Sequence, residues 1–346
     1  MSESIMGIHE ANVTEWMVSN VGAVAPLRFD LIAGGRSNLT YRVTDANGTS
    51  FALRRPPTSH VLPTAHDMVR EHTIISALSP LGVPVAKPLG LCTEESVNER
   101  PFYVMEFVEG AILRDRKEAE AAFSVAQRFD IGGNLAETLS SLHDVDVTKA
   151  GLGDLARHDG YIERQIRRWR GQYEQMAVEG VNHDGLVEAV GDQLAASIPT
   201  QQKVAVVHGD YRLDNTVLDT NGRVRAILDW EICTLGDPMA DLGLLLVYWA
   251  EPSDGTAALL GSAPTTAEGF MTRKQVLEAY ARHTSLDVSQ VGFYQAFGYW
   301  KLACILQGVF ARYSAGATAG DTGSVAEFPK HIALLAETAK RTLEEA

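Results

Sequence analysis

The sequence is poor in the features that define several large classes of protein. Its 346 residues include only three cysteines, Cys92, Cys233 and Cys304, and these lie far apart, without the spacing of a metal site or a disulfide framework. The longest strongly apolar stretch, 242–250, is too short to cross a bilayer. The N-terminus also lacks a basic segment followed by an apolar run. We therefore expect a cytoplasmic protein with no membrane partner.

Positive charge is also scarce. The chain has 30 lysines and arginines against 44 aspartates and glutamates, which gives a formal net charge of −14. An acidic surface repels phosphate backbones, so a nucleic-acid partner is not expected. The length favours two packed units over one small core, whereas the oligomeric state cannot be read from the sequence.

The N-terminal third predicts an antiparallel sheet with one inserted helix. Apolar-rich runs predict five strands, at 29–32, 39–44, 50–55, 87–92 and 102–108. The pair Asn47-Gly48 between the second and third runs is a strong hairpin signal. After the third run, the spacing of apolar residues predicts a helix over 65–78.

Beyond Gly110 helical periodicity dominates, except in a strand-rich segment at 204–230. We therefore predict an α+β fold of two lobes. The first, 1–108, is a β-rich N-lobe with one inserted helix, and the second, 109–346, is a mainly helical C-lobe.

Polar side chains crowd the end of a buried strand in "VVHGDYRLDN", residues 206–215. There Asp210 can direct a carboxylate at a substrate hydroxyl, and Asn215 can offer an amide oxygen to a metal. Asp229 follows the apolar run "VRAIL" and adds a hard oxygen ligand of the kind that Mg²⁺ prefers. Phosphoryl transfer needs this division of labour. The alternative is that these residues only cap their own turns.

The three segments "HGDYRLDN", "ILDWE" and "GDPMADLG" together resemble the aminoglycoside phosphotransferase family, which has a protein-kinase-like fold. The H-G-D-x-x-x-x-N pattern is similar to the kinase catalytic loop, and the Asp of "LDW" resembles the metal-binding Asp of kinases. The likeness covers roughly residues 29–315. It is strongest to a branch of bacterial phosphotransferases that includes the kinase-like domain fused to some acyl-CoA dehydrogenases.

The resemblance implies ATP and Mg²⁺ as cofactors and assigns roles to residues of the C-lobe. Asp210 is expected to be the catalytic base, and Asn215 and Asp229 the Mg²⁺ ligands. His208 and Asp241 are expected to be structural residues that support the same turn.

Two further segments are expected to bind the nucleotide. "AGGRSN" resembles a phosphate-covering loop, in which Gly34 and Gly35 permit close backbone approach and Ser37 and Asn38 offer donors. Glu106 and Val108, in "MEFVEG", are expected to contact the adenine edge through their backbone groups. A hairpin without nucleotide is the alternative for the first segment.

The third predicted strand departs from the kinase pattern. Kinases carry V-A-I-K there, whereas this chain has Phe51-Ala52-Leu53-Arg54. Strand alternation places Ala52 and Arg54 on one face, so Ala52 is expected to line the adenine pocket and Arg54 to meet the phosphates, paired with Glu71. A solvated Arg-Arg-Pro-Pro turn is the alternative.

The acceptor is expected to be a small molecule with a hydroxyl group, either aminoglycoside-like or a hydroxyacyl or other metabolite. Four arginines interleave with the apolar residues of the predicted helix 161–176, at positions 164, 167, 168 and 170. A solvated helix face is the favoured interpretation of them, and a basic wall for an anionic substrate is its rival. Trp300, Lys301, Arg312 and Tyr313 are further candidates that the sequence cannot place.

We therefore predict a Mg²⁺- and ATP-dependent kinase that phosphorylates a small-molecule alcohol. The departure at Arg54 keeps a second interpretation open, a nucleotide-binding module of pseudokinase type without transfer activity. A metal-dependent hydrolase is a weaker third, because no histidine-rich ligand set accompanies the carboxylates.

Overall fold

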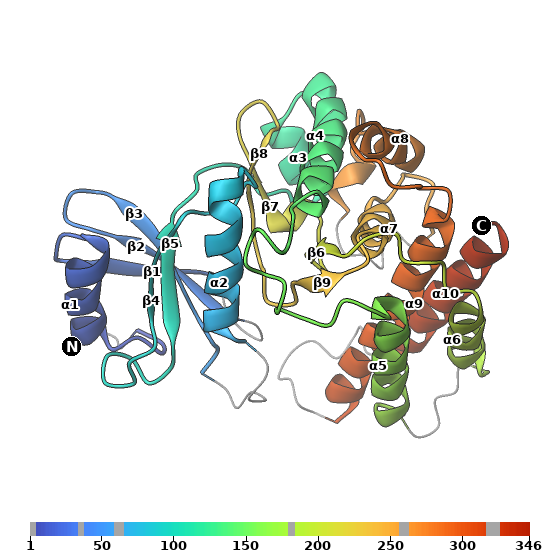
Figure 1. Cartoon of the computed structure of the whole chain (residues 1–346), viewed down its shortest axis with the longest axis horizontal. Helices are drawn as coiled ribbons and strands as arrows, with labels where there is room; N and C mark the ends of the chain where they lie inside the picture. Colours follow the sequence, from blue (N-terminus) through green and yellow to red (C-terminus); the bar gives the residue numbers. More distant parts are fainter. Residues whose placement is uncertain (1–4, 34–37, 59–65, 179–183, 256–262, 316–325) are drawn as a thin grey trace.

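The N-lobe of the computed structural model is built on a five-stranded antiparallel sheet (Figure 1). The structure describes residues 5–33, 38–58, 66–178, 184–255, 263–315 and 326–346. The strands lie in the order β1-β2-β3-β5-β4. Their bounds are Arg28–Ala33 (β1), Leu39–Thr44 (β2), Ser50–Arg55 (β3), Pro88–Cys92 (β4) and Phe102–Glu106 (β5). All five strands were predicted, and β5 ends two residues earlier than expected.

Two helices flank this sheet (Figure 1). Helix α2, Met68–Leu78, starts at Asp67, whose side chain accepts a hydrogen bond from the amide of Arg70 and caps the helix. The predicted helix at 65–78 therefore begins three residues later. Helix α1, Glu10–Val21, was not predicted. It packs its Trp16 edge-on against Phe102 of β5, with ring centroids 5.0 Å apart.

The two faces of the sheet belong to different hydrophobic cores. Side chains alternate along β5, so Phe102 and Val104 join the smaller core under α1, whereas Tyr103 faces α2. Helix α2 places Ile74 and Ile75 in the larger core, which continues into the C-lobe. One face of the N-lobe is thus fastened to the rest of the molecule, and the division between residues 108 and 109 stays a prediction.

The C-lobe is mainly helical. Its helices span Arg116–Ala122 (α3), Val125–His143 (α4), Tyr161–Gln175 (α5), Leu186–Ala196 (α6), Met239–Tyr248 (α7), Arg273–His283 (α8), Val291–Ser314 (α9) and Phe328–Glu344 (α10). No helix of the described residues is long and apolar enough to span a membrane. The long helix α9 packs against α5, α6, α7 and α10 and forms the centre of this lobe.

Four short strands carry the polar loops to the boundary between the lobes. Strand β6, Ala205–Val207, pairs with β9, Thr234–Gly236, and β7, Thr216–Leu218, pairs with β8, Val224–Ile227. The strand-rich segment predicted at 204–230 contains β6, β7 and β8, whereas β9 lies beyond it. The amide of Ile227 donates to the carbonyl of Pro84 at 2.7 Å, which ties β8 to the segment that precedes β4.

Candidate active site

A buried aspartate of α7 stabilises the turn that follows β6. Asp241 accepts hydrogen bonds from the amides of His208, at 2.6 Å, and Gly209, at 2.7 Å. Gly209 has a φ of +87°, which a side chain would strain. Burial alone would raise the pKa of Asp241, but His143, at 3.4 Å, and these amides outweigh it, so the pKa lies below its usual value.

His208 connects this turn to the loop that follows β8. Its Nε2 donates to the carbonyl of Leu228 at 2.8 Å, while its Nδ1 lies 3.3 Å from the amide of Asp210. The ring is fully buried and packs edge-on against Trp230, with centroids 4.9 Å apart. The geometry of His208 therefore fixes two loops relative to each other.

Asp210 and Asn215 are joined directly. The side-chain nitrogen of Asn215 donates to the backbone carbonyl and to Oδ2 of Asp210, both at 2.8 Å. Because an amide group is planar, Oδ1 of Asn215 points away from Asp210. That oxygen is left for a ligand.

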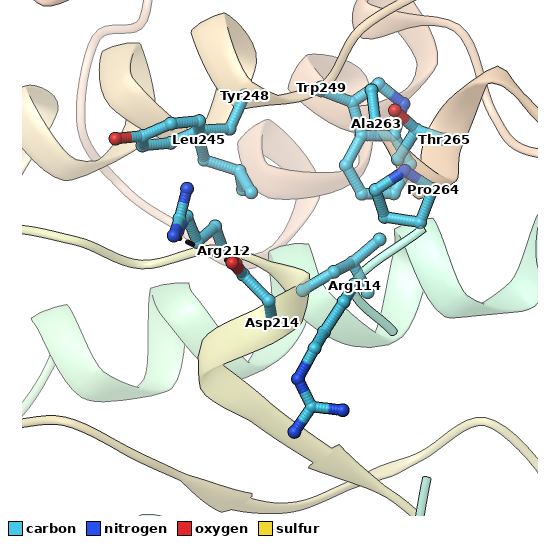
Figure 2. A pocket seen from close by; sticks show the side chains of 10 residues that line it. Arg114, Arg212, Asp214, Leu245, Tyr248, Trp249, Ala263, Pro264 and Thr265 are labelled. Atoms are coloured by element: carbon cyan, nitrogen blue, oxygen red, sulfur yellow. Dashed lines mark ion pairs between the residues drawn. The ribbon is translucent and has the colours of Figure 1, made fainter. Parts of the chain in front are cut away.

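Arg212, which was not among the residues expected from the sequence, lies between the carboxylates of Asp210 and Asp214, and Figure 2 shows its ion pair with Asp214. Its Nε is 3.5 Å from Oδ2 of Asp210, and its Nη2 is 2.7 Å from Oδ2 of Asp214. The guanidinium group stacks 4.5 Å from the ring centroid of Tyr248. Burial raises the pKa of Tyr248, and the negative charge of Asp210 adds to this effect. The proximity of Arg212 to Asp210 in "HGDYR" was the available signal.

Arg54 of β3 reaches across the cleft between the lobes. Its Nε pairs with Oε2 of Glu71 on α2 at 2.9 Å, and its Nη2 pairs with Oδ1 of Asp229 at 2.5 Å. Tyr103 donates to the same oxygen of Glu71 at 3.0 Å. Burial lowers the pKa of Arg54, but the surrounding negative groups, Glu71 first, raise it above its usual value and hold the guanidinium charged.

Asp229 sits in an unusual backbone conformation. Its φ is +61°, in the left-handed region that non-glycine residues seldom adopt, although Asp and Asn tolerate it best. Strain of this kind is common at functional sites. Since Arg54 occupies Oδ1, the second carboxylate oxygen remains available.

The predicted phosphate-covering loop is only partly described. Gly34, Gly35 and Ser37 lie outside the described residues. Asn38 is buried, and its side-chain nitrogen donates to Glu71 at 2.9 Å and to Glu231 at 3.3 Å. The side-chain nitrogen of Asn38 is therefore engaged by carboxylates, and the expected contact of Asn38 with a phosphate stays a prediction.

A cavity of about 430 Å³ lies between the lobes. Six of the predicted residues line it: Ala52, Arg54, Glu106, Val108, Asn215 and Asp229. Apolar side chains from both lobes form its inner walls, among them Val217 and Ile227. The amide of Glu106 already donates to the carbonyl of Lys87, so this amide is not available to a nucleotide. Glu71 lies behind Arg54 and does not line the cavity.

The residues at the mouth of this cavity suit a Mg²⁺ ion. Among the described residues, no cluster of three or more His, Cys, Asp or Glu side chains could hold a metal alone. Asp229 and Asn215 nevertheless offer one carboxylate and one amide oxygen on the same wall. Mg²⁺ is typically bound in this way, by one or two protein oxygens together with substrate phosphates and water.

Asp210 faces a second cavity, of about 590 Å³, which lies within the C-lobe. Of the four unplaced candidates near the C-terminus, Lys301 and Arg312 line this cavity. Trp300 is buried and donates to the carbonyl of Val187, and Tyr313 packs against Phe328. Arg168 of α5 also lines the cavity. The side chain is exposed to solvent, as the sequence suggested, and it also borders this cavity.

Comparisons with known proteins agree with this architecture. Residues 28–278 match the phosphotransferase enzyme family. The chain is 32% identical over 321 residues to acyl-CoA dehydrogenase family member 10 of Mus musculus. The match covers 91% of this chain but only 29% of that protein. The chain therefore spans less than a third of the length of this relative.

Solved structures extend the comparison. A Ralstonia eutropha protein assigned to the aminoglycoside phosphotransferases is 31% identical, with a TM-score of 0.80, and the match covers 97% of this chain and 98% of that one. Amicoumacin kinase, solved with AMP-PNP, Ca²⁺ and its antibiotic, has a TM-score of 0.60 at 18% identity, covering 94% and 93% of the two chains. The predicted protein-kinase-like fold is confirmed, as is the resemblance on which it rested.

Proposed function

The chain belongs to the phosphotransferase enzyme family and is a small-molecule kinase, and we propose that it transfers the γ-phosphoryl group of ATP to a hydroxyl group with the aid of Mg²⁺. One observation carries this proposal. Asn215 lines the cavity between the lobes, Asp210 lines the cavity in the C-lobe, and the two side chains are hydrogen-bonded at 2.8 Å. A donor site and an acceptor site thus meet at a carboxylate.

ATP occupies the cavity between the lobes. Ala52 of the N-lobe and the apolar side chains of β7 and β8 would enclose the adenine ring, and Glu106 and Val108 would contact its edge. Arg54 then faces the phosphates, where its guanidinium group supplies charge and a fork suited to phosphate oxygens. The complex of amicoumacin kinase, which shares the fold, with AMP-PNP supports nucleotide binding by this fold.

Asp229 and Asn215, which both line the cavity, would hold Mg²⁺ against the phosphates. When bound, the ion neutralises the charge that develops on the transferred group. Arg54 is shared between Asp229 and the phosphates, so it also sets the position of this metal ligand.

Asp210 accepts the proton of the acceptor hydroxyl. Asn215 and Arg212 fix its carboxylate, and Asp241 fixes the turn on which it stands. The acceptor oxygen forms a bond to the γ-phosphorus, the bond from that phosphorus to the β–γ bridging oxygen breaks, and ADP leaves. Positioning and electrostatic stabilisation account for most of the rate enhancement in such reactions.

The acceptor is a small hydroxylated molecule, an aminoglycoside or a hydroxylated acyl or other metabolite. The relative named for acyl-CoA dehydrogenases supports the second class, and the Ralstonia eutropha protein supports the first. We place the reaction in the cytoplasm, where ATP is plentiful and where Cys92, Cys233 and Cys304, all buried and unpaired, stay reduced.

Asp210→Asn tests the proposal. The variant should bind AMP-PNP with Mg²⁺ like the parent, since Asp210 does not line the nucleotide cavity. Phosphate transfer from ATP to a panel of hydroxylated metabolites should fall by ~10²–10⁴-fold. The matched control is Asp30→Asn, an exposed aspartate of β1, which should leave both measurements unchanged.

Two results would contradict the proposal in different ways. Near-parental transfer by the Asp210 variant would remove Asp210 as the base. Tight nucleotide binding by a parent protein that transfers phosphate to no acceptor would instead favour the nucleotide-binding module.

A further inference from the structure

The cavity in front of Asp210 is lined by more positive than negative charge. Helices α5 and α9 form its walls, and Gly209 and Asp210 lie at its base. Among the described residues that line it, Asp210 is the one carboxylate, whereas Arg168, Lys301 and Arg312 are cationic. This pattern opposes the net charge of −14 of the whole chain, so the positive lining is local to the cavity.

Lys301 is the deepest of the three cations. Its Nζ donates to the carbonyl of Gly209 at 3.1 Å, and among the described residues it forms no ion pair with a carboxylate. Burial lowers the pKa of Lys301, and Arg168 lowers it further, whereas Asp210 and Asp241 oppose this shift. A partly buried ammonium without an ionic partner favours the approach of an anion.

Trp169 supports two of these cations on its ring. Cζ of Arg168 lies 5.3 Å and Nζ of Lys301 lies 5.6 Å from the ring centroid. By contrast, the charge of the neighbouring Arg170 is compensated, because its guanidinium group pairs with Glu174 at 3.3 Å and with Asp192 at 2.6 Å. Arg168 and Arg312 form no ion pair with any carboxylate of the described chain.

The remaining lining of the cavity is apolar or neutral. Its apolar part is formed by Trp169, Met176, Ile232 and Ile305. A ligand that fits has an uncharged, partly apolar body, a hydroxyl group at Asp210 and a negative group at the cations.

We propose that the acceptor is a hydroxylated anion, whose carboxylate or phosphate group is bound by Arg168, Lys301 and Arg312. This inference rests on the proposed function and deepens it. A polycation such as an aminoglycoside would bring positive charge against three uncompensated cations, which costs free energy at short range. Of the two acceptor classes, the hydroxylated metabolite is therefore the one that fits this cavity.

Binding of four eight-carbon probes tests which headgroup charge the cavity prefers. The test does not require knowing where the hydroxyl group of the acceptor lies. Octanoate, octyl phosphate, octanamide and octylammonium are titrated by calorimetry into the parent protein saturated with AMP-PNP and Mg²⁺, so that the nucleotide cavity is filled. At least one anion should bind about tenfold or more tightly than the amide, and octylammonium should bind most weakly. The stronger of the two anions identifies the headgroup as a carboxylate or a phosphate.

Variants of the cavity wall complete the test. Arg168→Gln and Arg312→Gln, both at exposed positions, should each weaken the anion about fivefold and leave octanamide unchanged. Lys301→Met should weaken it about tenfold or more. The matched control is Arg167→Gln, because Arg167 is exposed on the same helix and does not line the cavity.

Failure of this inference is distinct from failure of the proposed function. Equal affinity for octanoate, octyl phosphate and octanamide, preferential binding of octylammonium, or no binding of any probe would overturn the anionic acceptor, while nucleotide binding stays intact. If the parent protein does not bind AMP-PNP, the proposed function is overturned instead. The probes can then be titrated into the protein without nucleotide.

Discussion

At the scale of single residues, Arg54 is largely buried and pairs with carboxylates from both lobes. One guanidinium group compensates Glu71, whose side chain is 2% exposed, and Asp229, which is 32% exposed. A lysine has one charged nitrogen at this point, whereas the planar fork of arginine reaches two carboxylates at once. The departure from the kinase pattern therefore serves the ion-pair geometry between the lobes.

Removing this cation should affect stability as well as nucleotide binding. Arg54→Ala leaves a buried carboxylate without its partner, and we expect the free energy of unfolding to fall by about 3–5 kcal/mol. The double variant Arg54→Met/Glu71→Gln removes both charges and should recover much of this loss, while AMP-PNP binding stays weak. Urea unfolding and calorimetry give the two readouts.

Arg28→Ala is the control for Arg54, because Arg28 forms an exposed ion pair with Asp30 and should change stability by less than about 1 kcal/mol. Parental stability and parental nucleotide affinity in Arg54→Ala would mean that Arg54 has neither role. Arg55 would not inherit it, since its guanidinium group donates to the carbonyl of Gly7, away from the cavity.

At the scale of elements, α7 supports the turn that carries Asp210. Asp241 in its first turn accepts the amides of His208 and Gly209, so the position of the turn depends on an ionised carboxylate. An asparagine at this position would set its NH₂ group against one of two buried amides. Asp241→Asn should therefore lower the free energy of unfolding by about 3 kcal/mol at pH 7.

This loss should depend on pH in a defined direction. The pKa of Asp241 is depressed in the folded protein, so its contribution is fully present above the unfolded pKa of about 3.9 and is lost as the pH falls through the folded value. The difference between parent and Asp241→Asn in urea unfolding should shrink below about pH 4. A difference that stays constant down to acid pH would contradict this account of the carboxylate.

The contact between α7 and α9 depends on a glycine. A Cβ at Gly243 would lie 2.5 Å from the backbone carbon of Tyr294, which allows no relief by side-chain movement. We expect Gly243→Ala to lower the free energy of unfolding by about 1–3 kcal/mol through overpacking. Gly171→Ala in α5 is the matched control, since nothing lies within 4 Å of its Cβ. That change should be stabilising, because alanine favours a helix more than glycine does.

At the scale of the whole molecule, nucleotide and metal should strengthen the connection between the lobes. The ion pair from Arg54 to Asp229 and the hydrogen bond from Ile227 to Pro84 join them directly. A ligand that binds the folded state at one hundred times its Kd adds about 2.7 kcal/mol to stability. AMP-PNP with Mg²⁺ should therefore raise the Tm of the parent more than AMP-PNP with EDTA.

The metal-dependent part of this rise should disappear in Asp229→Asn. Asparagine tolerates the left-handed backbone at this position, so the variant tests the ligand without adding strain. Asn215→Ala should show a smaller loss, because it removes a neutral ligand instead of a charged one. Equal or reversed losses of Mg²⁺ affinity would show that the ligand assignment is wrong.

Much of the molecule could be predicted from local patterns. The hairpin at Asn47-Gly48, the five strands and the helix over 161–175 follow from turn residues and from apolar periods of 2 and 3.6, which are local properties. The ordered segments around Asp210, Asp229 and Asp241 carried the resemblance to the family, because these residues occur at characteristic points of loops and helix starts.

Other features depend on contacts between residues far apart in the chain. Helix α1 and strand β9 lack strong local signals and are stabilised by packing on the sheet and by pairing with β6. Arg212 looks like an ordinary turn residue until the fold places Asp214 and Tyr248 around it.

The sequence by itself indicated the two-lobed fold, through local apolar periods of 2 and 3.6, and it proposed the candidate catalytic and metal-binding residues, through the resemblance of three ordered segments to a family. Only the tertiary structure decided which charges meet. It joined Arg54 to Asp229, 175 residues away, and it placed Arg168, Lys301 and Arg312 from two helices on one cavity wall. Electrostatic interactions act over distances in space, so the charge of a site follows from the fold and cannot be read from the net charge of the chain.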